Sequence, residues 1–223
     1  MSRARSRIAG VISVFGELLI TAGVVLGLFV VYSLWWTNVL ADREASRQGD
    51  QMRDGWAGPG ALDTKDGIGF LHVPAMSKGE VLVKQGTDAK ALNDGIAGYY
   101  TAPIKSALPW DPQGNFTLAA HRDGHGAKFH NIHKVREGDP VVFETRDTWY
   151  VYKVFKKLPE TSKYNVNVLQ PVPKESGKSK PGRYITLTTC TPVYTSDYRY
   201  IVWGELVREE KVDKNRTPPD ELR

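Results

Sequence analysis

Cysteine is nearly absent from this chain of 223 residues, in which Cys190 is the only one. A disulfide within the chain is therefore excluded. In a domain outside the cell, a lone cysteine indicates pairing with another molecule, a reactive thiol, or a small buried apolar side chain. Cys190 closes the segment Arg183–Cys190, which has the composition of a β-strand. All three interpretations remain open from this feature alone.

Signals for nucleic-acid binding and for metalloprotease chemistry are also missing. The lysines and arginines are scattered, and no nucleic-acid-binding module accompanies them. The net charge of +5 is a mild bias that suits a negatively charged envelope surface. No H-E-x-x-H motif is present, and no internal repeat is visible.

Charge is absent from Leu18–Ala41, which is strongly apolar. About 20 apolar residues cross a bilayer core, so this segment predicts a transmembrane anchor over residues 18–41. Trp35 and Trp36 lie near its C-terminal end, where aromatic side chains favour the interface. Three arginines precede the anchor, and the positive-inside bias places residues 1–17 in the cytoplasm and the rest of the chain outside.

The competing interpretation of this segment is a cleavable signal peptide, with Val39-Leu40-Ala41 as a small-residue cleavage site. The apolar run is longer than the apolar region of about 7–15 residues in such peptides, which favours a retained anchor. Glu17 is expected either at the inner interface, where its carboxylate reaches water, or against a partner helix.

Composition divides the outer part of the chain into three segments. Residues 42–60 are polar and contain several glycines, which predicts a stalk or linker. Residues 61–212 are globular in composition and long enough for one domain with its own core. Residues 213–223 are charged, contain a Pro-Pro pair and are expected to form a flexible tail.

Strand signals dominate the domain, and helix signals are few. One short helix is expected around Asp88–Asp94, ended by Gly95, and Lys157–Pro181 is expected to be a long loop. Short strands with Gly and Pro between them predict a mainly β fold, a barrel or a sandwich. The expected strands are Gly67–Val73, Glu80–Lys84, Asn115–His121, the hairpin Pro140–Thr145 and Thr148–Phe155, Tyr184–Cys190 and Arg199–Val207.

Three residues at strand ends are candidates for chemistry: His121, Cys190 and Arg199. If the last two strands pair as neighbours, Cys190 and Arg199 emerge at the same end of the sheet. A thiolate is a nucleophile whose pKa is lowered by nearby positive charge. A histidine can protonate a leaving amine, and a guanidinium can stabilise an oxyanion. Together these groups predict a cysteine transpeptidase or protease.

Two alternatives come from other classes of protein. His121, His125, His130 and His133 lie close together in the sequence, and with Cys190 they could form the site of a membrane-anchored zinc hydrolase. Their spacing matches no standard ligand pattern, and Gly124 and Gly126 would break a helix that aligned the first pair. The second alternative is a non-catalytic envelope-binding module with a buried cysteine.

Three motifs occur together and in order. Thr186–Pro192 reads TLTTCTP, Leu118–Arg122 reads LAAHR, and Arg199 lies within Ser196–Gly204. They resemble the TLxTC motif, the histidine strand and the arginine segment of the sortases, the cysteine transpeptidases of Gram-positive surfaces. The Cys-Thr-Pro sequence and the His-Arg-x-x-His-Gly sequence after the histidine strand are most similar to class E sortases of actinobacteria.

The resemblance implies a closed eight-stranded β-barrel with short helices, preceded here by one transmembrane helix. It implies that Cys190 cleaves a C-terminal sorting signal of LAxTG or LPxTG type between Thr and Gly, through a thioacyl intermediate, without a cofactor or metal. His121 would protonate the leaving amine and Arg199 would hold the oxyanion. Implied partners are secreted proteins with sorting signals and an amine of a peptidoglycan precursor or pilin. Expected groove residues are Thr188, Ala120 and Tyr100.

Overall fold

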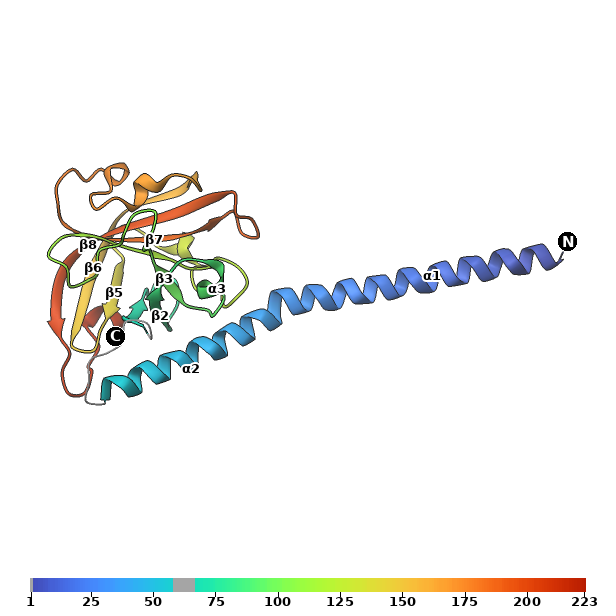
Figure 1. The fold of residues 1–223 in the computed structure, drawn as a ribbon, viewed down its shortest axis with the longest axis horizontal. Helices are drawn as coiled ribbons and strands as arrows, with labels where there is room; N and C mark the ends of the chain where they lie inside the picture. The colour runs from blue at the N-terminus through green and yellow to red at the C-terminus, as the bar shows by residue number, and fades with distance from the viewer. Residues whose placement is uncertain (1, 58–66) are drawn as a thin grey trace.

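Eight strands close into a barrel beside one end of a long N-terminal helix (Figure 1). The computed structural model describes residues 2–57 and 67–223. The strand order around the barrel is β1-β2-β3-β4-β7-β8-β6-β5, and β5 pairs with β1 to close it. The strands are β1 (Gly69–His72), β2 (Glu80–Gln85), β3 (Ala97–Tyr99), β4 (Gly114–Ala119), β5 (Pro140–Glu144), β6 (Thr148–Ser162), β7 (Arg183–Thr191) and β8 (Tyr198–Lys211).

The expected closed barrel is confirmed, and most of the expected strands lie where their sequence pattern placed them. The expected short helix is α3 (Ala89–Leu92), capped by the Asp88 carboxylate, which accepts a hydrogen bond from the Ala91 backbone N–H. The other short helices are 3₁₀ turns at Ile132–Lys134, Val166–Leu169, Lys174–Ser176 and Asp220–Leu222.

Two parts of the barrel differ from the expectation. Strand β3 has only three residues and no alternating pattern that would reveal it. It pairs parallel to β2. The backbone after β2 approaches it so closely that a Cβ on Gly98 would lie 1.8 Å from the Gly86 carbonyl oxygen, so this position requires glycine. Strand β6 continues through the first part of the expected loop to Ser162, held by pairing with β8 as far as Ser162 opposite Tyr198.

Side-chain alternation separates the inside of the barrel from a covered outer face. Ile185 and Leu187 of β7 point into the main core, on the face opposite that of Thr188 and Cys190. On β8, Ile201 and Trp203 point outward and are buried under Val168 and Leu169 of the 3₁₀ turn Val166–Leu169. The outer face of β8 is therefore covered by the 3₁₀ turn Val166–Leu169 at these residues and is not open to solvent there.

The N-terminal helix consists of α1 (Ser2–Val31), a π-helical turn η1 (Tyr32–Trp36) and α2 (Thr37–Ala57). Figure 1 shows them as one continuous rod. The stretch Ile12–Val31 is long and apolar enough to cross a membrane, with a mean hydropathy of 2.4. It starts earlier than the expected anchor at residues 18–41, and it includes Glu17. Residues 37–41 of that expected anchor form the start of α2.

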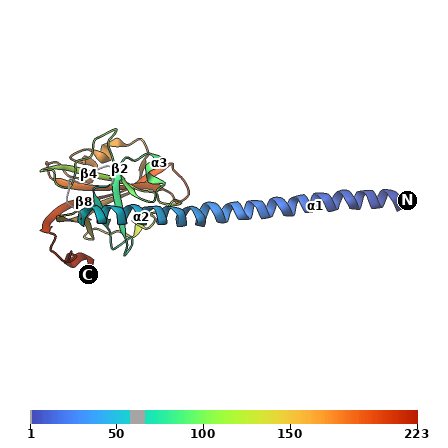
Figure 2. The same cartoon turned by 60° about the horizontal axis from the view of Figure 1, so that its bottom comes forward.

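Most of the segment expected to be a stalk is helical and lies against the barrel (Figure 2). Met52 packs with Phe70, Leu82 and Ile96 of the barrel, and Ala45 and Trp56 lie beside them. Only one stripe of α2 contacts the barrel, so most of its residues face solvent and are polar. This polar composition is why the sequence predicted a linker. Residues 58–66, which contain the expected end of the stalk and start of the domain, lie outside the described residues.

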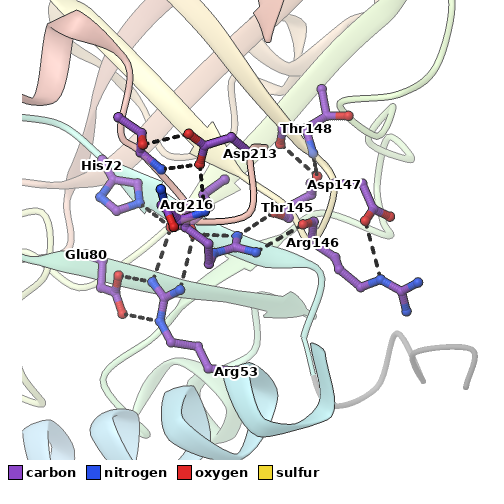
Figure 3. A network of polar contacts seen from close by, with 12 residues as sticks. Arg53, His72, Glu80, Thr145, Arg146, Asp147, Thr148, Asp213 and Arg216 are labelled. Atoms are coloured by element: carbon purple, nitrogen blue, oxygen red, sulfur yellow. Dashed lines mark hydrogen bonds and ion pairs between the residues drawn. The ribbon is translucent and has the colours of Figure 1, made fainter. Parts of the chain in front are cut away.

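A buried carboxylate joins α2, the barrel and the C-terminal segment. Glu144 of β5 accepts hydrogen bonds from Arg53 of α2 at 3.1 Å and from Arg216 at 2.6 Å, and it contacts His72 at 3.0 Å. Arg53 also pairs with Glu80, and Figure 3 shows these side chains converging from separate elements. Burial alone would raise the pKa of Glu144, but the bonds from His72, Arg53 and Arg216 outweigh it and lower the pKa to about 2.

The C-terminal residues, expected to be a flexible tail, fold back onto the barrel. Arg216 reaches Glu144, and Arg208 forms a two-pronged pair with Glu221 at 2.5 and 2.6 Å. Val212 and Leu222 pack beside a cluster of buried residues that includes Trp149. The sequence predicted a flexible tail because its charged composition shows no local structure. The pairings that hold the tail join it to distant side chains, and a local pattern does not reveal them.

Glu144→Gln should lower the free energy of unfolding by about 3 kcal/mol at pH 7, because it removes the carboxylate of Arg216 and leaves Arg53 with Glu80 alone. The folded-state pKa of Glu144 lies below its ordinary value of 4.5. Its stabilisation is therefore complete above pH 4.5 and is lost as the pH falls toward 2. Urea unfolding of the full chain should show the difference between variant and wild type shrinking over that range.

Asp147→Asn is the matched control, because this carboxylate is 73% exposed and its contact with Arg146 is long, at 3.5 Å. Its effect should stay below about 0.5 kcal/mol. Equal effects of the two substitutions would contradict a special role for Glu144.

Candidate active site

Cys190 and Arg199 face each other across two neighbouring strands. They are a directly opposed pair in the antiparallel ladder of β7 and β8, next to the loop that joins the strands. Directly opposed residues of such a ladder point to the same face of the sheet. The expected proximity of Cys190 and Arg199 is therefore found, and Cys190 remains partly exposed.

His121 reaches the same edge through a parallel pairing. Strand β4 runs parallel to β7, with Ala119 beside Thr188. Continuing that register by two residues aligns His121 with Cys190. Two contacts extend the pairing past the end of β4: the Ala120 N–H donates to the Thr188 carbonyl at 3.3 Å, and the Thr189 hydroxyl donates to the Ala120 carbonyl at 2.7 Å. The ends of β4, β7 and β8 thus place the three candidate residues at the same edge of the sheet.

Two of the expected groove residues lie on the same outer face as Cys190. The Thr188 hydroxyl donates to the Leu118 carbonyl at 3.0 Å, and it lies 3.0 Å from the Tyr100 hydroxyl. Tyr100 also packs against the outer cluster around Trp203. Burial raises the pKa of Tyr100, while the charges of Arg199 and Cys190 act on it in opposite directions. The electrostatic influence of both residues therefore reaches the Tyr100 hydroxyl.

Ala120 differs from the expectation. Its methyl group is buried in the interior core of the barrel, with 4% of the residue exposed. The side chain therefore does not face the outer surface on which Cys190 lies. What Ala120 provides is its backbone, which ties the His121 segment to β7.

Arg122 is a site residue whose position the sequence did not reveal. It is only 7% exposed, donates to the Thr191 hydroxyl at 2.6 Å and lies over the ring of Tyr200. It also reaches the Cys190 carbonyl at 3.4 Å. A buried guanidinium beneath the Cys190 strand end holds that end in place and adds positive potential there. Its adjacency to His121 was visible in the sequence, but its burial was not.

The imidazole of His121 is held by an amide. Its Nε2 lies 2.9 Å from Oδ1 of Asn93, which follows α3 directly. Burial lowers the pKa of His121, the neighbouring His125 lowers it further, and Asp123 opposes both. The rings of His121 and His125 are 5.5 Å apart. Nothing in the sequence around Asn93 indicated this contact, because it joins the end of a short helix to a distant strand end.

The histidine cluster does not form a metal site in the described part of the chain. His130 is engaged elsewhere, since its Nδ1 lies 2.9 Å from the Arg122 carbonyl oxygen. The one group of three metal-type ligands found among residues 2–57 and 67–223 is His72, Glu80 and Glu144. Arg53 and Arg216 occupy the carboxylate oxygens of this group, so it is an ion-pair network rather than a metal centre.

Comparison with known proteins identifies the family. The model of the sortase domain matches residues 71–207. Sortase SrtE2 of Streptomyces coelicolor is 69% identical over 99% of this chain and 92% of its own length. Sortase SrtE1 of the same organism is 45% identical over 99% of this chain and 64% of its own length.

Solved structures agree with the sequence comparisons. The crystal structure of sortase E1 from Streptomyces coelicolor, with a tripeptide in its active site, covers 73% of this chain and all of its own, with a TM-score of 0.67 and 46% identity. Sortase E from Streptomyces avermitilis covers the same share, with a TM-score of 0.63 and 32% identity. The chain therefore belongs to the sortase family of cysteine transpeptidases, which anchor proteins, and it matches class E.

His125→Ala should raise the pKa of His121, because it removes a neighbouring imidazole that disfavours the protonated form. Burial, the largest cause, remains, so the pKa should stay below its ordinary value of 6.5. NMR titration of the His121 ring carbons measures this directly. His133→Ala, on an exposed part of the turn Ile132–Lys134, should leave the titration unchanged. An unchanged or lowered pKa in His125→Ala would contradict the electrostatic coupling.

Proposed function

We propose that Cys190 is the nucleophile of a membrane-anchored sortase that cleaves a C-terminal sorting signal of LAxTG or LPxTG type between Thr and Gly. The observation that carries the proposal is the cross-strand pairing of Cys190 with Arg199, at the edge where β4 delivers His121. A thiolate, an imidazole and a guanidinium at one strand edge supply a nucleophile, an acid and an oxyanion donor.

In the first step, the Cys190 thiolate adds to the carbonyl carbon of the threonine. The carbonyl oxygen gains the charge and is held by the Arg199 guanidinium. The C–N bond to glycine then breaks, and the leaving amine takes a proton from the His121 imidazolium. The product is a thioester between Cys190 and the substrate protein.

In the second step, an amine from a peptidoglycan precursor or a pilin attacks the thioester. His121, now neutral, accepts a proton from that amine, and the C–S bond breaks to return the Cys190 thiolate. The substrate protein ends in a new amide bond. If water attacks instead, the same intermediate gives hydrolysis.

We place the arginine-bearing N-terminus on the cytoplasmic side and the barrel outside the cell, with the apolar N-terminal helix as the anchor. The arginines near the N-terminus and the apolar stretch Ile12–Val31 support this orientation. Tyr100 and Thr188 are proposed to line the signal groove, because their hydroxyls meet on the outer face beside Cys190. Among the described residues, the zinc hydrolase and the non-catalytic binding module have no observation in their favour.

Cys190→Ala should abolish both cleavage and transfer and leave the fold intact, because Cys190 is a partly exposed strand-end residue and not a large core side chain. The full chain in detergent is incubated with an LAxTG peptide and an amine, and the acyl-enzyme is sought by mass spectrometry. The wild type should gain the mass of the acyl fragment and the variant should not. Appreciable cleavage by the alanine variant would rule out the covalent mechanism.

Arg199→Lys should be much weaker than the wild type, although it keeps the charge. The Arg199 guanidinium donates to the carbonyls of Ser196 and Tyr198 at 3.1 and 2.9 Å, so part of its fork shapes the loop before β8. An ammonium group cannot reproduce that fork while reaching the substrate. The loss should fall on kcat if Arg199 acts on the oxyanion, and on KM if it only docks the peptide. Near-wild-type values of both parameters would remove Arg199 from the site.

A further inference from the structure

Helix α2 contacts the loop that follows His121. Asn38 of α2 accepts a hydrogen bond from the Gly126 backbone N–H at 2.8 Å. One turn further along the helix, Asp42 pairs with Lys128 at 2.7 Å. Loop 124–128 is thus bound at two points to the part of α2 that follows the π-helical turn η1.

The same helix also contacts the turn that carries Asn93. Gly95 packs so closely on α2 that a Cβ there would lie 2.8 Å from the Ala41 carbonyl oxygen, and its φ of +73° favours glycine. The Gln48 amide donates to the Asp94 carboxylate at 3.1 Å. Gly126 meets the same turn, since a Cβ there would lie 3.4 Å from the Gly95 Cα. Loop 124–128, turn 93–95 and α2 therefore form one contact region.

His121 lies between these two segments. An amide oxygen can only accept a hydrogen bond, so the contact between Asn93 Oδ1 and His121 Nε2 requires a hydrogen on Nε2. This leaves Nδ1 as the nitrogen that can exchange a proton with a substrate. The neighbouring groups that act on the ring are His125 and Asp123, both on the loop side. Asn93, on the side of turn 93–95, fixes the His121 tautomer that carries its hydrogen on Nε2.

We propose that α2 is a positioning element of the catalytic site, which holds turn 93–95 against loop 124–128 so that Asn93 orients the His121 imidazole. The inference rests on the proposed role of His121 as the proton donor. It assigns a catalytic purpose to the juxtamembrane helix, and it makes Asn93, Asn38 and Gln48 positioning residues rather than catalytic ones.

The test compares variants of the full-length protein in detergent micelles, with two readouts. The first is the His121 pKa from NMR titration of its ring carbons, which does not depend on activity. The second is kcat and KM with an LAxTG peptide and an amine. The variants are Asn93→Ala, Asn93→Asp, the double variant Asn38→Ala with Gln48→Ala, and Gln48→Ala alone in case the double variant is unstable.

Asn93→Ala should lower the His121 pKa, because the lost hydrogen bond is stronger to the protonated ring, and kcat should fall roughly tenfold with little change in KM. Asn93→Asp should raise the His121 pKa above that of the wild type, since a carboxylate accepts the same bond and adds a negative charge. A purely structural role of Asn93 would instead make the two substitutions alike, and that result would overturn the proposal.

The helix variants decide whether α2 takes part. The double variant and Gln48→Ala should shift the His121 pKa in the same direction as Asn93→Ala, by less, and lower kcat severalfold. Arg47→Ala is the matched control, because Arg47 lies on the same helix and pairs with Glu44 within it. Wild-type values of both readouts in the double variant, or equal losses in Arg47→Ala, would overturn the inference.

His121→Ala separates this inference from the proposed function. An inactive His121→Ala together with unmoved pKa values in the helix variants would overturn only the role of α2. Transfer by His121→Ala at wild-type rate would overturn the role proposed for His121, while the pKa readout would still report whether α2 and Asn93 orient the ring.

Discussion

The site depends on the parallel pairing of β4 with β7. Parallel strands end at the same edge of a sheet, so residues that close both strands become neighbours although about 70 residues separate them in the chain. The antiparallel return through β8 then adds Arg199 directly opposite Cys190. Barrel closure leaves no free edge on which these strands could slip, and the outer cluster around Trp203 fixes the face on which Cys190 lies.

Much of this arrangement could be predicted from the sequence. Period-two alternation in Tyr184–Cys190 separates the face of Ile185 and Leu187 from that of Cys190, and the structure has them on these opposite faces. The three candidate residues were recognisable from their positions at the ends of strand patterns. Strand β3 was missed because a segment of three residues, Ala97–Tyr99, is too short to show an alternating pattern. Asn93 and Arg122 were missed as site residues because their importance comes from long-range contacts, with His121 and with Thr191, which no local pattern encodes. Ala120 was expected in the groove, but it lies two residues after the inward-facing Leu118, so the regular alternation points its methyl group into the core.

Electrostatics explains why the segments on either side of the domain are ordered. Composition predicted a stalk or linker before the domain and a flexible tail after it, since both segments are polar. In the fold, Arg53 and Arg216 meet over one buried carboxylate, Glu144, which holds α2 and the C-terminal segment on the same side of the barrel (Figure 3). Both guanidiniums also lie over the ring of Trp56, so they bury their stems while their charge is paired.

The helix α2 fixes the distance between the barrel and the apolar segment, which a flexible stalk would not do. A coil of the length of residues 42–60 would let the domain range over roughly 25 Å from its anchor. In the helix, Asn38 lies seven residues beyond the end of the apolar stretch Ile12–Val31, which corresponds to about 10 Å of axial rise. Asn38 also binds the loop after His121. Asn38 therefore fixes the distance between this loop and the apolar span. Under the proposed roles of α2 and His121, the height of the candidate site and the orientation of the imidazole would both depend on this one helix.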